Sequence, residues 1–144
     1  MDYVCRLLQK DDYYLGFPEL LNQLTPCIKS SYEEFSDRLV QMKLLNPMNN
    51  TYVIEYYGKI VATAKLCIEL KLHNNFAQMA LIEDVVVSEE CRGMGFGKNI
   101  TDVLVQRAKA EKCYKIVLNC SKDNIPFYEK CNFKQKGMEM TMYL

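Results

Sequence analysis

Apolar and polar residues alternate along several short segments of the chain, with the period of two that is typical of β-strands. Two of these segments flank Gly58, which predicts a hairpin with a tight turn. The second arm of this hairpin is expected to continue to about Leu70, and a loop over 71–75 then leads into a central strand. The expected strands are 3–8, 51–57, 59–70, the central strand ending at Val87, 114–119, one at Phe133 and one over 138–143.

Apolar residues at helical spacing predict four helices between these strands. Pro18 is expected to disturb the middle of the first helix. A capping box, Ser-Tyr-Glu-Glu, opens the second helix, and Asn46 begins the segment that ends it. Pro126 is tolerated in the first turn of the last helix. The expected helices are about 11–24, one that opens at 31–34, one that fades near 111–112, and about 124–130.

The order of these elements predicts an α/β fold of the α+β type. Its sheet is mainly antiparallel, with one parallel crossover through the helix that fades near 111–112. No composition break, internal repeat or low-complexity tract divides the 144 residues, so we expect a single domain over 1–144. A chain of this length buries roughly two-thirds of the surface that it exposes when unfolded.

Charge and cysteine content argue against binding of nucleic acid or membranes and against a metal site. Lysine and arginine total 18, as do aspartate and glutamate, so no global field attracts nucleic acid or an acidic membrane. We find no signal peptide and no apolar stretch of the roughly 20 residues that would span a bilayer. Seven cysteines without a C-x-x-C pair, and His73 as the one histidine, predict reduced thiols in a cytoplasmic protein without a metal site.

The sequence Arg-Gly-Met-Gly-Phe-Gly-Lys over 92–98 stands between the central strand and the third helix. Glycines at alternate positions let the backbone turn with its N–H groups inward, and the following helix adds the positive end of its dipole. Such a loop is suited to an anion, most often phosphate or pyrophosphate. The spacing differs from the dinucleotide fingerprint G-x-G-x-x-G, and Asn99 after Lys98 excludes a P-loop. A turn that only caps a helix is the alternative, but the flanking Arg92 and Lys98 favour phosphate.

Arg-x-x-Gly-x-Gly after a strand resembles the pyrophosphate loop of the Gcn5-related N-acetyltransferases (GNAT), and residues 124–133 resemble that family's motif N-x-x-[FA]-Y-x-[KR]-x-[GN]-F. The resemblance implies a twisted, mostly antiparallel sheet of about six to seven strands, flanked by about four helices. It implies acetyl-CoA as cosubstrate and a homodimer whose C-terminal strands exchange or pair. The residues that it assigns to acetyl-CoA are Val85, Val86, Val87, Arg92, Gly93, Met94, Gly95, Phe96, Gly97, Lys98, Asn124, Phe127, Tyr128 and Lys130.

Within the family, four segments are most similar to the members that acetylate glucosamine 6-phosphate, a step toward UDP-N-acetylglucosamine. These segments are 23–25, 82–87, the glycine-rich loop 92–98, and 113–133. The implied activity is transfer of acetyl from acetyl-CoA to the 2-amine of the sugar phosphate by direct attack. Acetylation of another amine, and a non-catalytic acetyl-CoA-binding module, are the alternatives.

Direct attack of an amine on a thioester needs an oxyanion donor, a path for the amine proton and an acid for the leaving sulfur. The resemblance implies that Tyr128 is the acid and that the backbone N–H of Val85 binds the oxyanion. Glu83 and Asp84 are adjacent carboxylates in an apolar strand, where burial without partners would be costly. By resemblance they contact the sugar and the reacting end of the coenzyme, and a β-bulge re-aims one of them.

Two positions depart from the family's pattern. Asn119 stands where relatives have an acidic residue that helps to take the amine proton, and an amide is not a base at neutral pH. The proton then leaves through water to Glu83 or Asp84, or catalysis is slower. Tyr143 replaces an arginine that reaches the sugar phosphate across the dimer, so the phosphate depends more on Lys71 or another cation. The remaining substrate contacts that the resemblance implies are Thr25, Lys71, Asn74 and Lys115.

Overall fold

A five-stranded mixed sheet forms the centre of the protein. The computed structural model describes residues 2–26 and 29–144. The strands lie in chain order, with β1 to β4 antiparallel and β5 parallel to β4. Their bounds are β1 Tyr3–Leu7, β2 Asn50–Tyr56, β3 Lys59–Leu70, β4 Gln78–Val87 and β5 Cys113–Leu118. The mixed α/β class and the single parallel crossover are therefore confirmed.

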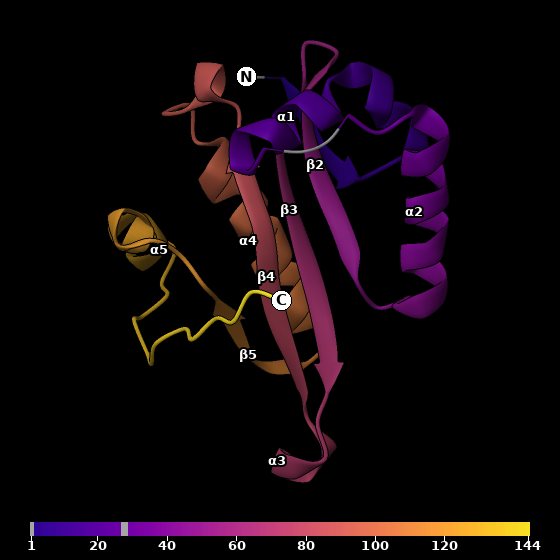
Figure 1. Cartoon of the computed structure of the whole chain (residues 1–144). Helices are drawn as coiled ribbons and strands as arrows, with labels where there is room; N and C mark the ends of the chain where they lie inside the picture. Colours follow the sequence, from indigo (N-terminus) through magenta and orange to yellow (C-terminus); the bar gives the residue numbers. More distant parts are fainter. Residues whose placement is uncertain (1, 27–28) are drawn as a thin grey trace.

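Helices cover the sheet on both faces (Figure 1). One face carries α4, which provides the crossover from β4 to β5, and α1 crosses the upper end of the other face. The longer α2 stands beside the β1–β2 edge, and α5 lies beyond β5. The bounds are α1 Phe17–Leu24, α2 Tyr32–Leu45, α3 His73–Phe76, α4 Phe96–Ala110 and α5 Ile125–Lys130. No helix in residues 2–26 and 29–144 is long and apolar enough to cross a membrane.

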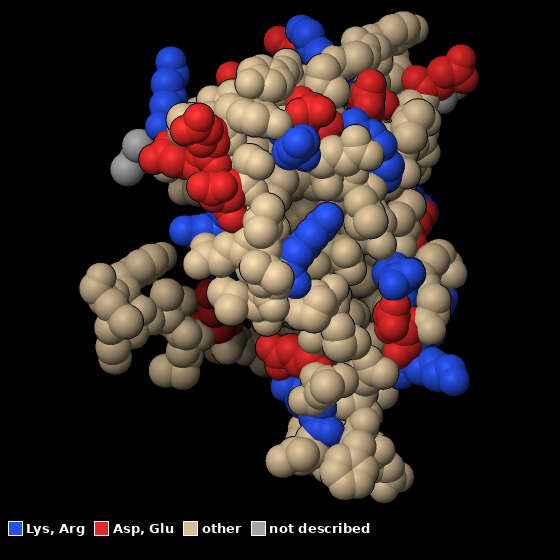
Figure 2. All heavy atoms as spheres, turned by 90° about the vertical axis from the view of Figure 1, so that its right-hand side faces the viewer, with Lys and Arg blue, Asp and Glu red and all other residues tan. Residues whose placement is uncertain are grey.

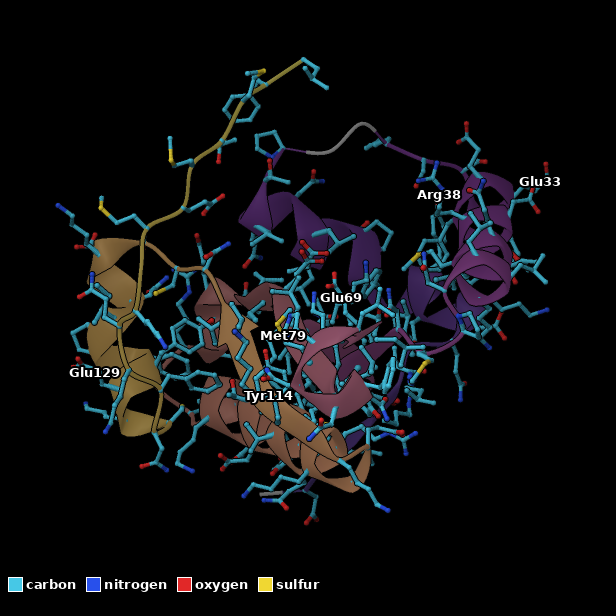
Figure 3. The ribbon with its side chains drawn as sticks, turned by 90° about the horizontal axis from the view of Figure 1, so that it is seen from below. Glu33, Arg38, Glu69, Met79, Tyr114 and Glu129 are labelled. Atoms are coloured by element: carbon cyan, nitrogen blue, oxygen red, sulfur yellow. The ribbon has the colours of Figure 1, made fainter. Side chains whose placement is uncertain are left out.

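Strand alternation divides the core into two clusters. Alternate residues of the central strands, such as Leu66 and Ile82, pack against Ile100 and Leu104 on the inner stripe of α4. On the opposite face, Val53, Ile60 and Val86 pack against Phe17 and Leu20 of α1. Because α1 covers only the upper part of this second face, no helix of the described residues covers the lower part of β3, β4 and β5 (Figure 3). Figure 3 labels one residue of each of these strands there: Glu69, Met79 and Tyr114.

The expected first helix over 11–24 is wrong in one respect, because glycine interrupts it. A 3-10 helix covers Lys10–Leu15, and Gly16 with a φ of 89° separates it from α1. Only glycine adopts this left-handed conformation at little cost. Pro18 therefore lies in the first turn of α1, where its missing N–H costs nothing, and not in mid-helix.

The β2–β3 hairpin and the start of α2 have the turn and the cap that the sequence predicts. Tyr57 and Gly58 have φ values of 48° and 71°, as a tight turn with two left-handed residues requires. The Ser31 hydroxyl accepts from the Glu34 N–H, and the Glu34 carboxylate accepts from the Ser31 N–H, so the predicted capping box is formed. Local chemistry alone determines both features.

The β3–β4 hairpin projects far beyond the body of the sheet (Figure 1). Its tip, α3, turns through Asn74 and Asn75, both in the left-handed region with φ values of 51° and 58°. Leu72 and Phe76 are exposed there, and the tip is largely uncharged on the face in Figure 2. Over the rest of that face, acidic and basic side chains are interspersed, as a net charge of zero suggests.

The two last strands expected from the sequence are absent from the described chain. Residues 133–144 form no strand, and Met138, Met140 and Met142 are each more than four-fifths exposed. Figure 3 shows this segment leaving α5 and running away from the sheet. A strand forms only when its backbone groups find a ladder partner, and alternating side chains do not supply one. The count of six to seven strands is therefore corrected to five.

Candidate active site

A β-bulge interrupts β4 at the two adjacent carboxylates. Glu83 pairs with Lys65 and Val86 pairs with Thr63, so Asp84 and Val85 together lie opposite one residue of β3. Asp84 has a φ of 53°, which identifies it as the extra residue. Both carboxylate residues are exposed although β4 is an inner strand. The bulge expected from the sequence is therefore present, and it leaves both side chains accessible.

The bulge coincides with the point where β4 and β5 separate. The parallel pairing ends at Ile82 and Leu118, whereas β4 continues to Val87. From Glu83 onward, the edge of β4 that faces β5 lacks a neighbouring strand in the part of the chain that the structure describes. Asn119 is the first residue beyond β5 and is exposed, so it follows directly on the last paired residue, Leu118.

The glycine-rich loop follows directly and forms the start of α4. Gly93 and Gly95 have φ values of 80° and 87°. Gly95 is the N-cap and supplies no capping side chain, so the first N–H groups of a 15-residue helix are available to an anion. Arg92 is exposed, with its guanidinium 3.8 Å from the Glu89 carboxylate. This loop has the geometry of an anion site.

Phe96 does not face the anion side of this loop. Its side chain is 1% exposed and packs against the rings of Tyr3 and Tyr56, with centroids 5.4 Å and 5.2 Å away. Of this residue only the backbone can meet a ligand. Lys98 is exposed and pairs with Asp102, one turn further along α4. Of the expected coenzyme contacts in this loop, Phe96 can thus contribute only its backbone, and the Lys98 ammonium already has Asp102 as a partner.

The second motif packs against the first. A Cβ atom at Gly97 would lie 3.2 Å from Cζ of Phe127 and 3.5 Å from Cγ2 of Val87. A side chain at this position would therefore be crowded, and glycine lets α4 approach α5 and β4 without displacing the Phe127 ring. Asn124 and Lys130, at the two ends of α5, are both exposed. Gly97 and Phe127, 30 residues apart in the sequence, thus bring the two motifs into contact.

Tyr128 is held on α5 with its side chain turned inward. It is 8% exposed, and its ring packs edge-on against Phe127 and Phe133 at 4.9 Å and 6.0 Å. Burial raises the pKa of the phenol above its ordinary value. The hydroxyl is therefore protonated at neutral pH, which is the state that a proton donor needs.

Several expected substrate contacts lie away from this centre within one chain. The Lys71 ammonium is 2.6 Å from the Glu69 carboxylate. The backbone N–H of Lys71 donates to the carbonyl of Ala77, which lies six residues before Glu83 on the chain. At about 3.3 Å per residue this is about 20 Å along the strand. Asn74 lies further out, at the exposed tip of the hairpin.

Three other expected contacts have different surroundings. Thr25 is the C-cap of α1, and its N–H donates to the carbonyl of Leu21. Lys115 pairs with Met79, toward the lower end of β4, and its ammonium lies 5.4 Å from the centre of the Tyr114 ring. Tyr143 is 94% exposed in the C-terminal segment. Of these three, Lys115 is placed relative to Glu83 by the strand register, four residues away along β4 at the level of Met79.

Sequence reasoning missed the residues of β3 that face Glu83. The ammonium of Lys65 is 3.9 Å from Oε2 of Glu83, and Sγ of Cys67 is 3.6 Å from the same oxygen. Burial raises the pKa of the Cys67 thiol to about 11. Alternation along β3 does place 65 and 67 on one face, but their position opposite Glu83 depends on the β3–β4 register.

No group of three or more histidine, cysteine, aspartate or glutamate residues could hold a metal ion among residues 2–26 and 29–144. Six cysteines there are free thiols, of which Cys120 is exposed, and Cys27 lies outside the described residues. A cavity of about 320 Å³ lies between α2 and the ends of β1 and β2, away from Glu83 and Tyr128.

Comparison with known proteins accounts for this arrangement. Residues 17–133 match the model of the acetyltransferase (GNAT) family. The chain belongs to this family. The crystal structure of glucosamine-6-phosphate N-acetyltransferase from Arabidopsis thaliana superimposes with a TM-score of 0.95 and 37% sequence identity, and it covers 99% of each chain. The matched range includes the glycine-rich loop, the bulged strand β4 and Tyr128.

Relatives in the GNAT family extend over almost the whole chain. Glucosamine 6-phosphate N-acetyltransferase from A. thaliana is 39% identical over 96% of this chain and 94% of its own length. The Dictyostelium discoideum protein of the same name is 38% identical over 96% and 89%. A Trypanosoma brucei acetyltransferase structure has a TM-score of 0.92 at 32% identity and covers 99% and 100%. The family predicted from the two motifs is therefore confirmed.

Proposed function

We propose that this chain transfers the acetyl group of acetyl-CoA to the 2-amine of glucosamine 6-phosphate, giving N-acetylglucosamine 6-phosphate and CoA. The full-length similarity to enzymes of that name supports this acceptor. The observation that carries the proposal is the bulge at Asp84, which exposes two carboxylates where β4 and β5 separate. This reaction belongs to the synthesis of UDP-N-acetylglucosamine, and we propose that it occurs in the cytoplasm, in a single domain over 1–144.

The residues of the glycine-rich loop suit the pyrophosphate of acetyl-CoA. Arg92 and Lys98 carry the charge, and the N–H groups after Gly95 point toward the anion. The unpaired edge of β4 over 85–87 can hydrogen-bond an extended pantetheine arm, with Phe127 beside it. A GNAT structure from Clostridium acetobutylicum, which shares the fold at 22% identity, contains acetyl-CoA.

Each chemical step can be assigned to a residue at this opening. The amine attacks the thioester carbon, and the N–H of Val85 donates to the oxyanion as the tetrahedral centre forms. When the C–S bond breaks, the Tyr128 hydroxyl donates its proton to the sulfur. Glu83 and Asp84 accept the amine proton through water. Asn119 orients this water, because an amide donates and accepts hydrogen bonds but is not a base.

Replacing Asn119 by aspartate tests this proton path. Asn119→Asp introduces a base at the opening, so we expect kcat at neutral pH to rise by up to about tenfold. The measurement is the pH profile of kcat for the two proteins. An identical profile would mean that the proton leaves entirely by way of Glu83 and Asp84.

We further propose a homodimer. The C-terminal segment exposes Met138, Met140 and Met142, and methionine at every second position is the sequence pattern of a strand with one apolar side. Pairing of this segment with a second copy would bury these side chains. A second copy could also bring its own hairpin tip, with Lys71 and Asn74, to the site.

Release of CoA thiol with three acceptors tests the proposed activity: glucosamine 6-phosphate, glucosamine and a lysine peptide. We expect turnover with the sugar phosphate at a kcat/KM well above those of the other two. Turnover of unphosphorylated amines alone would contradict the sugar phosphate assignment. No turnover, together with tight binding of acetyl-CoA, would indicate the alternative that Asn119 favours, a non-catalytic acetyl-CoA-binding module.

A further inference from the structure

The phosphate of the acceptor needs a cation close to Glu83 and Asp84, and most candidates are too far away. Lys71 is about 20 Å along the strand from Glu83, which is much longer than one hexose phosphate. Lys115 pairs at the level of Met79, four residues before Glu83, or about 13 Å. Arg92 belongs to the loop that suits the coenzyme. One chain therefore needs another cation on the face of the sheet that carries Glu83.

Lys65 meets this requirement. It is the cross-strand partner of Glu83, and its ammonium is 3.9 Å from Oε2 of that carboxylate. It is also the only charged residue between Ile60 and Ile68, in the middle of a strand that is otherwise buried or nearly so. A lysine in the middle of an inner strand is unusual unless its ammonium has a structural or functional partner.

The ion pair alone does not account for this lysine. The two side chains are 22% and 44% exposed, and a pair this accessible stabilises a protein by less than about 1 kcal/mol. A separation of 3.9 Å is at the long end for an ion pair. The ammonium has three N–H donors, so it can donate to a second anion while it stays beside Glu83. Cys67 also contacts this carboxylate through Sγ, which keeps Glu83 in place when the ammonium turns to a ligand.

We propose that Lys65 binds the phosphate of the amino-sugar acceptor from within the same subunit, with Glu83 holding the ammonium at the edge of the sugar site. The inference rests on the proposed function and identifies the residue that selects a phosphorylated acceptor. The ammonium donates to a phosphate oxygen while Glu83 and Asp84 remain at the amine. Lys65 thus supplies charge that Tyr143 cannot provide at the C-terminus.

Kinetics of Lys65→Met with two acceptors test the proposal. Loss of a hydrogen bond to a charged group should raise KM for glucosamine 6-phosphate about tenfold or more and leave kcat within about twofold. Turnover of unphosphorylated glucosamine should fall far less than that of the sugar phosphate, because it has no phosphate to lose. Lys65→Arg should restore most of the affinity. Lys59→Met, on the same strand but at the β2–β3 turn, is the matched control and should behave as the wild type.

Other outcomes would overturn the assignment. An equal loss with both acceptors would mean that Lys65 only positions Glu83. An unchanged KM in Lys65→Met, with a raised KM in Lys71→Met, would assign the phosphate to the hairpin tip of a partner subunit. Calorimetric binding of N-acetylglucosamine 6-phosphate and N-acetylglucosamine gives a readout independent of turnover, and Lys65→Met should weaken only the first. A wild-type protein that does not acetylate glucosamine 6-phosphate would refute the proposed function itself. Failure of the proposed function is thus distinguished from failure of the Lys65 assignment, which only the variants test.

Discussion

At the scale of single residues, the site depends on side chains whose surroundings control their protonation. Tyr128 is buried between two phenylalanine rings, and Cys67 is buried beside Glu83, so burial raises the pKa of both groups. Both are therefore neutral at physiological pH. For Tyr128 this is the form that can donate a proton, and for Cys67 it is the form that does not compete as a nucleophile.

Tyr128→Phe should lower kcat by about 100-fold, because general acid catalysis typically contributes at least this much. The ring and its packing remain, so the Kd for acetyl-CoA should change little. The active form is the protonated phenol, and its raised pKa shifts the alkaline loss of wild-type activity to a higher pH than an ordinary tyrosine would give. Stopped assays of kcat against pH measure both effects. An unchanged kcat would remove Tyr128 as the acid.

At the scale of elements, one ion-pair cluster fastens the chain before α1 to the sheet. Arg6 on β1 makes two hydrogen bonds with Asp12 at 2.7 Å and 2.8 Å, and one with Glu55 on β2 at 2.8 Å. Asp12 is 1% exposed and also accepts from the N–H of Gln9. The cluster fixes where the 3-10 helix Lys10–Leu15 leaves the sheet edge, and so where α1 begins.

Asp12→Ala should lower the free energy of unfolding by about 3 kcal/mol or more, because it leaves Arg6 half-buried without its main partner. Chemical denaturation followed by circular dichroism measures this change. Asp37→Ala, an exposed position on α2, is the control and should alter stability by less than about 0.5 kcal/mol. Equal stability of the two variants would contradict the role of the cluster.

Features of single elements were predicted from the sequence when the residues that form them are close together along the chain. The capping box at Ser31, the turn at Gly58 and the anion loop are each determined by neighbours within a few residues, and all were predicted. The pairing of Lys65 with Glu83 depends on the register of two strands, which no local pattern contains. The interruption at Gly16 was missed because apolar spacing continues across it.

At the scale of the whole molecule, two parts extend from the body and form no strand pairing with it in residues 2–26 and 29–144, apart from the base of the hairpin. These are the β3–β4 hairpin tip and residues 134–144 (Figure 1). Exposed methionines in the second part recur at alternate positions, which explains why the sequence predicted strands there. The sequence contains the pattern for a strand, but in a single chain the ladder that would make it one is missing from the described residues.

Met140→Glu should therefore shift the protein from dimer toward monomer, because it introduces a charge into the side that pairing would bury. Sedimentation velocity at several concentrations measures the shift. Thr141→Glu changes the opposite side of the extended segment and is the matched control. A dimer of equal strength in both variants, or a monomer in the wild type, would contradict the proposed assembly.

Asp84 is an extra residue in a strand that would otherwise pair regularly with β3, and the proposed catalytic groups of β4 lie at this extra residue. Without Asp84, Val85 would stand opposite Ala64, and the ladder from Lys65–Glu83 to Ala62–Val87 would be continuous. Every core residue on either side would keep its face. We therefore expect a protein that lacks only this residue to fold cooperatively and to bind acetyl-CoA, yet to be inactive. Thermal melting and ligand titration of the deletion variant test whether architecture and catalysis can be separated by one amino acid.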